Sequence, residues 1–175
     1  MGFGHCAFGL AAKPLCPKLP LGVLIAAPLL LDLLAIVLGF AGIEGVQRGF
    51  PWSHGLAAAV VWSLAAGVGA AWASRSRQAG VVNGALVLSH WVLDYVTHPI
   101  PMNSFSWSAR RWNYGQPLAP DLPLLGASGP KVGLGLYNAM SACQATGLEV
   151  GLVAVGIVIY CKTGARRAEH DAAKI

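Results

Sequence analysis

Charged residues are scarce in this chain of 175 residues: Asp, Glu, Lys and Arg make up only 11% of it, whereas hydrophobic residues make up 55%. A soluble domain of average composition carries roughly a quarter charged residues. The shortage is concentrated in long apolar runs, because residues 21–43 and 55–74 contain a single charged side chain, that of Asp32. This composition excludes a disordered chain and an ordinary soluble enzyme, and it predicts a small polytopic membrane protein.

Cysteine pairs and a basic stripe are lacking as well. The four cysteines are Cys6, Cys16, Cys143 and Cys161. None of them belongs to a CxxC pair or has the spacing of a zinc finger, so we interpret them as small hydrophobic residues in or near helices. The net charge is +5, but the basic residues form no stripe with interleaved aromatics, which excludes nucleic acid as a partner. The run after residue 20 is too long for a signal-peptide core and lacks a clear cleavage site, so we expect it to stay in the membrane.

The chain contains enough apolar sequence for several membrane crossings of about 20 residues each. The predicted fold is therefore all-α: a single transmembrane helix bundle over residues 1–161. The four spans are predicted at about 21–43, 52–73, 79–98 and 134–161. Residues 2–12 are apolar but too short to cross, so we expect a re-entrant or interfacial helix there. Residues 99–131 hold six of the eleven prolines and are predicted as an outer loop, and residues 162–175 as a polar tail.

The basic residues predict the orientation of this bundle. If the turn at Arg75 and Arg77 is cytoplasmic, eight Lys and Arg residues lie on that side and four lie on the other. Cytoplasmic segments of membrane proteins carry the excess of Lys and Arg. We therefore predict a cytoplasmic C-terminal tail and an outward-facing loop over residues 99–131.

Acidic and imidazole side chains are few, but they gather at predicted membrane depth. The three acids inside predicted spans are Asp32, Asp94 and Glu149. The histidines in spans, at span ends or in the short leader are His5, His54, His90 and His98. Ionisable groups at lipid depth are costly and normally face a partner or a hydrated cavity. We therefore expect these side chains to converge on one polar pocket.

The third predicted span spaces its polar residues at helical intervals. His90, Asp94 and His98 are four residues apart, so His90 and Asp94 share one face, where they can bind one ion or each other. At about 1.5 Å per residue, Asp32 and His90 lie roughly 16 and 12 Å below the outer ends of their spans. Pro28, one turn before Asp32, loosens the helical ladder and favours a cavity there.

Each polar residue also has an interpretation that involves no metal. In that interpretation, His54 anchors the start of its span at the interface, His5 lies among lipid headgroups, and His98 is an exposed helix end. Glu149 is then a helix-packing or proton-relay acid. His170, in the polar tail, has no expected role.

The predicted outer loop combines aromatic and basic residues. They are Trp107, Arg110, Arg111, Trp112 and Tyr114. The combination is typical of an interfacial aromatic belt with snorkelling arginines. The alternative is a surface on which Arg110 and Arg111 bind a lipid phosphate.

Five short motifs follow one another along the chain. They are Gly4-His5, Leu31-Asp32-Leu33, Pro51-Trp52-Ser53-His54, Ser-His-x3-Asp at residues 89–94, and the segment Lys131–Asn138. In their order and spacing, through Cys161, the chain resembles the YdjM-type membrane-bound metal-dependent hydrolases, an uncharacterised family of small bacterial inner-membrane proteins. That group resembles zinc-dependent phospholipase C in the order of its histidines and aspartates.

The resemblance implies a set of metal ligands in an inner-membrane protein whose partner is membrane lipid. The implied ligands are His5, Asp32, His54, His90, Asp94 and His98. The implied cofactor is Zn²⁺ or another divalent metal. The sequence departs from the family at Gly55, which follows His54 where the family usually has a serine, so a hydroxyl group beside that ligand is missing.

The expected function is metal-dependent hydrolysis of a phosphoester or another ester at the membrane. His54, His90 and Asp94 bind the ion, which lowers the pKa of a bound water toward neutrality. Asp32 and Asp94 are the expected catalytic carboxylates, and Asp32, with His5, either binds a second ion or orients the water. The residues expected on the substrate side are Arg110, Arg111 and Glu149.

Two non-catalytic functions use the same residues. In the first, the buried groups carry protons or a cation, and a carrier with so few spans would need to form a homo-oligomer. In the second, the protein has a structural or assembly role, and the polar groups join helices by hydrogen bonds. Small residues would then allow close helix contact: Gly67, Gly69, Gly133 and Gly135.

Overall fold

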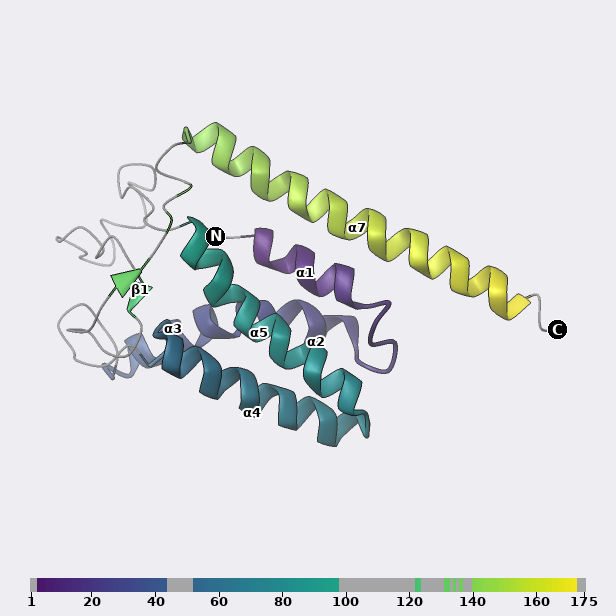
Figure 1. Cartoon of the computed structure of the whole chain (residues 1–175), viewed down its shortest axis with the longest axis horizontal. Helices are drawn as coiled ribbons and strands as arrows, with labels where there is room; N and C mark the ends of the chain where they lie inside the picture. The colour runs from purple at the N-terminus through teal and green to yellow at the C-terminus, as the bar shows by residue number, and fades with distance from the viewer. Residues whose placement is uncertain are drawn as a thin grey trace.

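A computed structural model gives the fold of the chain, which is helical except for one very short strand pair (Figure 1). It describes residues 3–43, 52–97, 122–123, 131–132, 134, 136 and 140–172. The helices are α1 (Gly4–Ala12), α2 (Leu21–Ala26), the 3-10 turn η1 (Ala27–Leu29), α3 (Leu30–Phe40), α4 (Leu56–Ser74), α5 (Arg77–Thr97) and α7 (Ala142–Ala172). Strands β1 (Leu122–Pro123) and β2 (Lys131–Val132) pair antiparallel.

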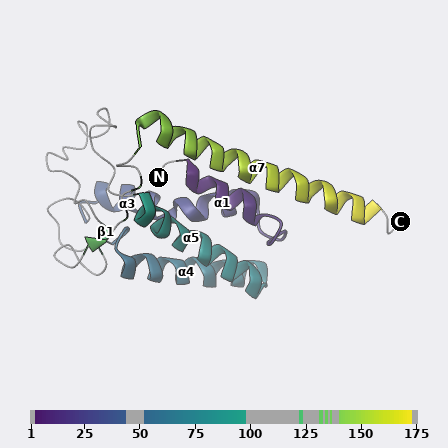
Figure 2. The ribbon, with the colours of Figure 1, turned by 45° about the horizontal axis from the view of Figure 1, so that its top comes forward.

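Within the residues that the structure describes, four helical segments are long and apolar enough to cross a membrane. By length and composition they are Leu21–Phe40, Leu56–Ser74, Arg77–Thr97 and Cys143–Arg166. The prediction of an all-α protein with four membrane-spanning helices is therefore confirmed. The short α1 lies beside them and runs along α7 and α2 (Figure 2).

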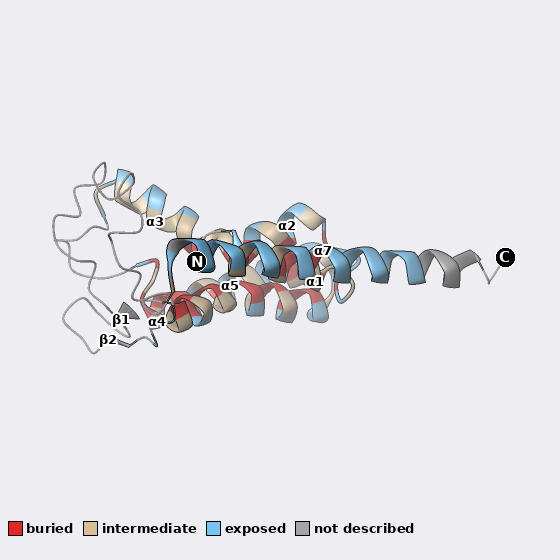
Figure 3. Ribbon diagram, turned by 90° about the horizontal axis from the view of Figure 1, so that it is seen from above, coloured by how far each residue is buried: buried red, intermediate tan, exposed pale blue. Residues whose placement is uncertain are grey.

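The first span is broken in the middle. Pro28 lies in η1, between α2 and α3, where proline cannot donate the helical hydrogen bond of its own position. Below the break, α2 and η1 pack against α1, and η1 also packs against α5. Above the break, α3 packs mainly against η1 and α5 among the described helices, and it leads away from the other helices in Figure 3.

Glycines allow the backbones of α4 and α5 to approach closely. A Cβ atom on Gly80 would lie 2.7 Å from the Gly67 carbonyl oxygen, and one on Gly84 would lie 2.9 Å from the Ser63 carbonyl oxygen. Small residues in membrane helices allow backbones to approach in this way. Of the other glycines expected to do so, Gly69 faces open space, while Gly133 and Gly135 lie outside the described residues.

Helix α1 is enclosed between α7 on one side and α2 and α5 on the other. A Cβ atom on Gly156 of α7 would lie 2.7 Å from the Ala7 carbonyl oxygen, so α7 packs directly on the α1 backbone. Only 6% of the apolar window of α7 is buried, compared with 44% in α5. Thus α5 lies at the centre of the bundle, and α7 is attached to its edge through α1.

Local capping interactions set the helix ends at positions different from the predicted span limits. Helix α3 ends at Phe40, before Gly42 at φ 68°, where Ile43 N–H donates to the Leu38 carbonyl in a Schellman motif. Helix α7 begins at Ala142, eight residues after the predicted start at 134, because Ser141 and Gln144 form a capping box.

The other ends of the predicted spans also differ from the helices. Helix α4 begins at Leu56, after an extended Gly55 and a turn over residues 52–54. Helix α7 continues to Ala172, so most of the predicted polar tail is helical. Alanine, lysine and arginine are good helix formers, and the only breaker-type residue in residues 162–172 is Gly164.

Candidate metal centre

Five of the residues singled out in the sequence come together where four segments of the chain meet. His5 comes from α1, Asp32 from α3, His54 from the turn before α4, and His90 and Asp94 from α5. Two groups of three have ligand atoms within 4.8 Å of one another. These groups are His5, His90 and Asp94, and Asp32, His54 and His90.

The rings of His90 and His54 present their Nε2 atoms to one another. The Nδ1–H of His90 donates to the Pro28 carbonyl at 2.7 Å, which leaves the lone pair of neutral His90 on Nε2. His54 Nδ1 lies 2.7 Å from the Ser53 hydroxyl, and its Nε2 lies 3.2 Å from that of His90. Two imidazole ligands of one tetrahedral ion have nitrogens about 3.3 Å apart, given metal–nitrogen bonds of about 2.0–2.1 Å. The pair is therefore spaced to share a cation or a proton.

A carboxylate lies on each side of this histidine pair. Asp32 Oδ1 is 3.3 Å from His54 Nε2 and 3.5 Å from His90 Nε2. Asp94 Oδ2 is 3.1 Å from His90 Nε2 and 3.8 Å from His54 Nε2. Two imidazoles and two carboxylates are a donor set suited to Zn²⁺ and related divalent ions.

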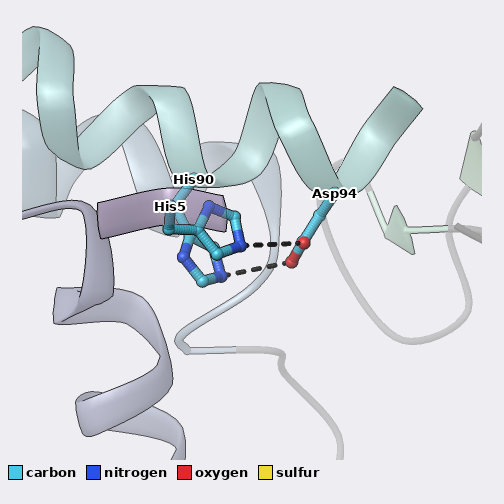
Figure 4. Close-up of side chains that lie close together, drawn as sticks. All are labelled: His5, His90 and Asp94. Carbon is cyan, nitrogen blue, oxygen red and sulfur yellow. Dashed lines mark ion pairs between the residues drawn. The ribbon is translucent and has the colours of Figure 1, made fainter. Parts of the chain in front are cut away.

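His5 uses the second oxygen of Asp94. Its Nε2 lies 3.5 Å from Asp94 Oδ1, and its ring stacks on that of His90 with centroids 4.0 Å apart and planes at 13° (Figure 4). Burial lowers the pKa of His5 below the ordinary histidine value, so the ring is neutral near pH 7 and keeps a lone pair for a ligand. Asp94 thus lies across the edges of two parallel imidazoles, and each ring faces one of its oxygens.

The centre is buried on one side and open on the other. His5 and His90 are fully buried, and Asp94 is 3% exposed. The side chains of Asp32 and His54, by contrast, are 45% and 23% exposed. A molecule that reaches the centre therefore meets Asp32 and His54 first.

Two groups that hold the histidines were not singled out as site residues in the sequence. They are the Pro28 carbonyl and the Ser53 hydroxyl. In the sequence, Ser53 stands out only as the neighbour of His54 in a motif. It supplies from the preceding position a hydroxyl group that Gly55 cannot supply. The Pro28 carbonyl had no signal of its own, because any backbone carbonyl can accept such a bond.

The remaining predicted site residues are not placed at this centre. His98, Arg110 and Arg111 lie outside the described residues. Glu149 lies on α7 and belongs to neither ligand group among the residues that the structure describes. The fifth motif does reach the neighbourhood, since the Leu134 N–H donates to the Tyr95 carbonyl at 2.8 Å, next to Asp94.

Comparison with known proteins does not identify a family for this chain. No protein-family model matches the chain, and no curated protein or solved structure matches it either.

Proposed function

We propose that this protein is a membrane-bound metal-dependent hydrolase that cleaves a phosphoester or another ester at the membrane. One observation carries the proposal: the Nε2 atoms of His54 and His90 face each other at 3.2 Å between two carboxylates. Because the Pro28 carbonyl occupies Nδ1–H of His90, the arrangement leaves a lone pair in a place that favours a cation. The resemblance to the YdjM-type hydrolases agrees with this chemistry.

In this proposal two buried residues and the partly exposed His54 hold the ion, and the exposed carboxylate of Asp32 meets the substrate. His54, His90 and Asp94 are the ligands, and a divalent ion such as Zn²⁺ supplies a bound water with a pKa near neutrality. Asp32, which is half-exposed on the open side, accepts the proton of that water or orients it. His5 holds the second oxygen of Asp94 or takes a second ion there.

The placement of the protein in a cell is part of the same proposal. The resemblance suggests a bacterial inner membrane, and the excess of Lys and Arg suggests a cytoplasmic C-terminus. The centre then lies toward the outer leaflet, where Arg110 and Arg111 bind the anionic group of the substrate. Glu149 is proposed as a further acid on the substrate side.

Metal content and hydrolysis test the proposal together. Protein purified in mild detergent should contain a stoichiometric divalent metal by elemental analysis and should hydrolyse a chromogenic phosphoester or carboxylic ester. In His90→Ala and Asp94→Ala, both metal and hydrolysis should be lost, because each change removes a buried ligand. His170→Ala, at the far end of α7, is the matched histidine control and should keep both. Unchanged metal content in the double variant His90→Ala/Asp94→Ala would exclude a metal centre at these residues.

A non-catalytic role is the second candidate, and the burial of three of the five side chains favours it. His5, His90 and Asp94 are almost fully enclosed and joined to one another across α1 and α5. In that role they stabilise the bundle by interhelical polar contacts. Asp94→Asn distinguishes the two candidates, because an amide keeps a hydrogen-bonding shape but ligates metal poorly. Unchanged melting temperature, with no metal in either protein, would favour the structural role.

A further inference from the structure

Helix α3 borders the open side of the centre, and it carries exposed apolar side chains close to Asp32. Asp32 lies in the span Leu21–Phe40, and at about 1.5 Å per residue its eight-residue distance from Phe40 is roughly 12 Å. On the same helix, Leu33, Ile36 and Val37 are 50%, 46% and 63% exposed. In a membrane-spanning segment, such side chains face lipid.

The other helices of the centre end close to it. Asp94 lies three residues before the end of α5 at Thr97, and His54 lies two residues before the start of α4 at Leu56. Both distances correspond to about 3–5 Å along a helix axis. The centre therefore lies just inside one end of α4 and α5, close to the level where a bilayer changes from hydrocarbon to headgroups.

Among the described residues, helix α3 packs mainly against η1 and α5. Above the break at Pro28 it diverges from α4 (Figure 3). The exposed half of the centre, Asp32 and His54, belongs to α3 and to the turn before α4. The buried half is covered by α1 and α5.

We infer that the centre opens sideways into the bilayer, between α3 and the start of α4, and that its substrate is a lipid. This inference rests on the proposed function and names its substrate class. The bond to be cleaved is an ester or phosphoester at the junction of headgroup and acyl chains, because that part of a lipid lies at the level where α4 and α5 end, beside His54 and Asp94. The acyl chains stay in the membrane beside Ile36, which lies one turn after Asp32 on α3.

Hydrolysis of such a bond needs no reactant other than water. Water adds to the carbonyl or phosphoryl centre, the bond to the alkoxy oxygen breaks, and the proton accepted by Asp32 passes to the departing oxygen. The products are an acid and an alcohol; cleavage of a phosphoester bond leaves both acyl chains on one product, whereas cleavage of an acyl ester bond divides them between the two. A product that keeps an acyl chain leaves by the lipid side, and a product without one leaves toward the headgroups.

Two tryptophan variants test the sideways opening. Ile36 lies one turn after Asp32 on the same face of α3, so Ile36→Trp narrows the opening, whereas Val37→Trp adds the same bulk on a different face. The substrates are a long-chain diacylphospholipid in vesicles and its dibutyryl analogue in free solution. With Ile36→Trp, hydrolysis of the vesicle lipid should fall roughly tenfold or more, because the bond is displaced from the centre. Metal content and hydrolysis of the short-chain analogue should not change, and Val37→Trp should change neither rate.

Equal effects of the two variants on the vesicle lipid, or faster hydrolysis of the dibutyryl analogue by the unmodified protein, would overturn the inference. Absence of metal and of hydrolysis with both substrates would instead overturn the proposed function.

A second measurement tests the opening without catalysis. A fluorophore on Asp32→Cys, with the four native cysteines replaced by alanine, should be quenched by a lipid carrying a nitroxide near the headgroup. Quenching by aqueous iodide should be weaker. Strong iodide quenching without lipid quenching would assign the opening to water and exclude access from the bilayer.

Discussion

Single polar contacts decide which atoms the histidines of the centre present. The Pro28 carbonyl holds one nitrogen of His90, and the Ser53 hydroxyl holds the corresponding nitrogen of His54. Metal-ligating histidines usually have such a partner on the second ring nitrogen, which fixes the orientation of the ring. Ser53 is fully buried, so its hydroxyl is shielded from competition with solvent.

The contact between the Ser53 hydroxyl and His54 is expected to strengthen metal binding. Ser53→Ala should weaken metal binding about 10–100-fold, because His54 loses the partner that orients its ring. A competition titration with a chelating dye measures the change. Ser63→Ala is the matched control, since Ser63 is also buried but donates its hydroxyl hydrogen to the Ala59 carbonyl within α4. Equal affinity of the Ser53 and Ser63 variants would show that this contact does not position His54.

The sequence predicts the ligand types of the centre better than the contacts that hold them. His90 and Asp94 could be paired from their spacing on one helix, and Asp32 stood out as the only charge in its span. The contact of His90 with Pro28 joins residues 62 positions apart, and it depends on how two helices cross. No local pattern contains that information.

The hairpin of α4 and α5 supports the centre at the scale of elements. Its turn consists of Arg75 and Ser76: Arg75 has a left-handed backbone at φ 51°, and Ser76 accepts the Ala79 N–H at the start of α5. Along the hairpin, glycines replace side chains where the backbones meet. The position of α5, and with it of His90 and Asp94, therefore depends on residues far from the centre.

Substitution of one glycine tests this dependence. Gly80→Ala should lower the free energy of unfolding by about 1–3 kcal/mol, because the added methyl group meets the Gly67 carbonyl oxygen at 2.7 Å. Gly69→Ala has nothing within 4 Å and should be neutral or slightly stabilising. Thermal unfolding in detergent, followed by circular dichroism, compares the two. If Gly80→Ala melts at the same temperature as Gly69→Ala, close backbone contact does not stabilise the hairpin.

The existence of the four spans follows from the sequence because transfer of apolar side chains to lipid dominates their energy. Their ends do not follow from hydropathy, because one or two hydrogen bonds determine where each helix stops. The start of α7 illustrates this: the pattern Ser141-x-x-Gln144 is readable in the sequence, but hydropathy alone extends the span back to Leu134. The break at η1 was foreseeable from Pro28, whereas the divergence of α3 was not.

At the scale of the whole molecule, the ends of the spans carry different charges. The turn at Arg75 and Arg77 and the last turns of the long helix at Lys162 and Arg166 lie at one end of the bundle, and the candidate centre lies at the other (Figure 1). Such an asymmetry sets the direction of insertion. The centre and the basic end are therefore expected on opposite sides of the membrane.

Reporter fusions measure this direction. A green fluorescent protein fused after Ile175 should fluoresce, because its fold forms in the cytoplasm, and alkaline phosphatase fused there should be inactive. Fusions after Thr97 should give the reverse result, since one more span lies between the two positions. Active phosphatase at Ile175 together with fluorescence after Thr97 would place the candidate centre on the cytoplasmic side.

The pairing of His5 with Asp94 also constrains the order of events during synthesis. The ribosome produces α1 before α5, and roughly half of the chain separates the two residues. At about 5–20 residues per second, Asp94 is synthesised on the order of 5–20 seconds after His5, which it contacts in the folded protein. A short helix that cannot span the bilayer must be kept in place during that interval, first by α2, which packs against it after a turn in which the Lys13 ammonium donates to the carbonyls of Pro17 and Leu19. The nascent chain therefore completes its polar centre only after the third crossing has been inserted.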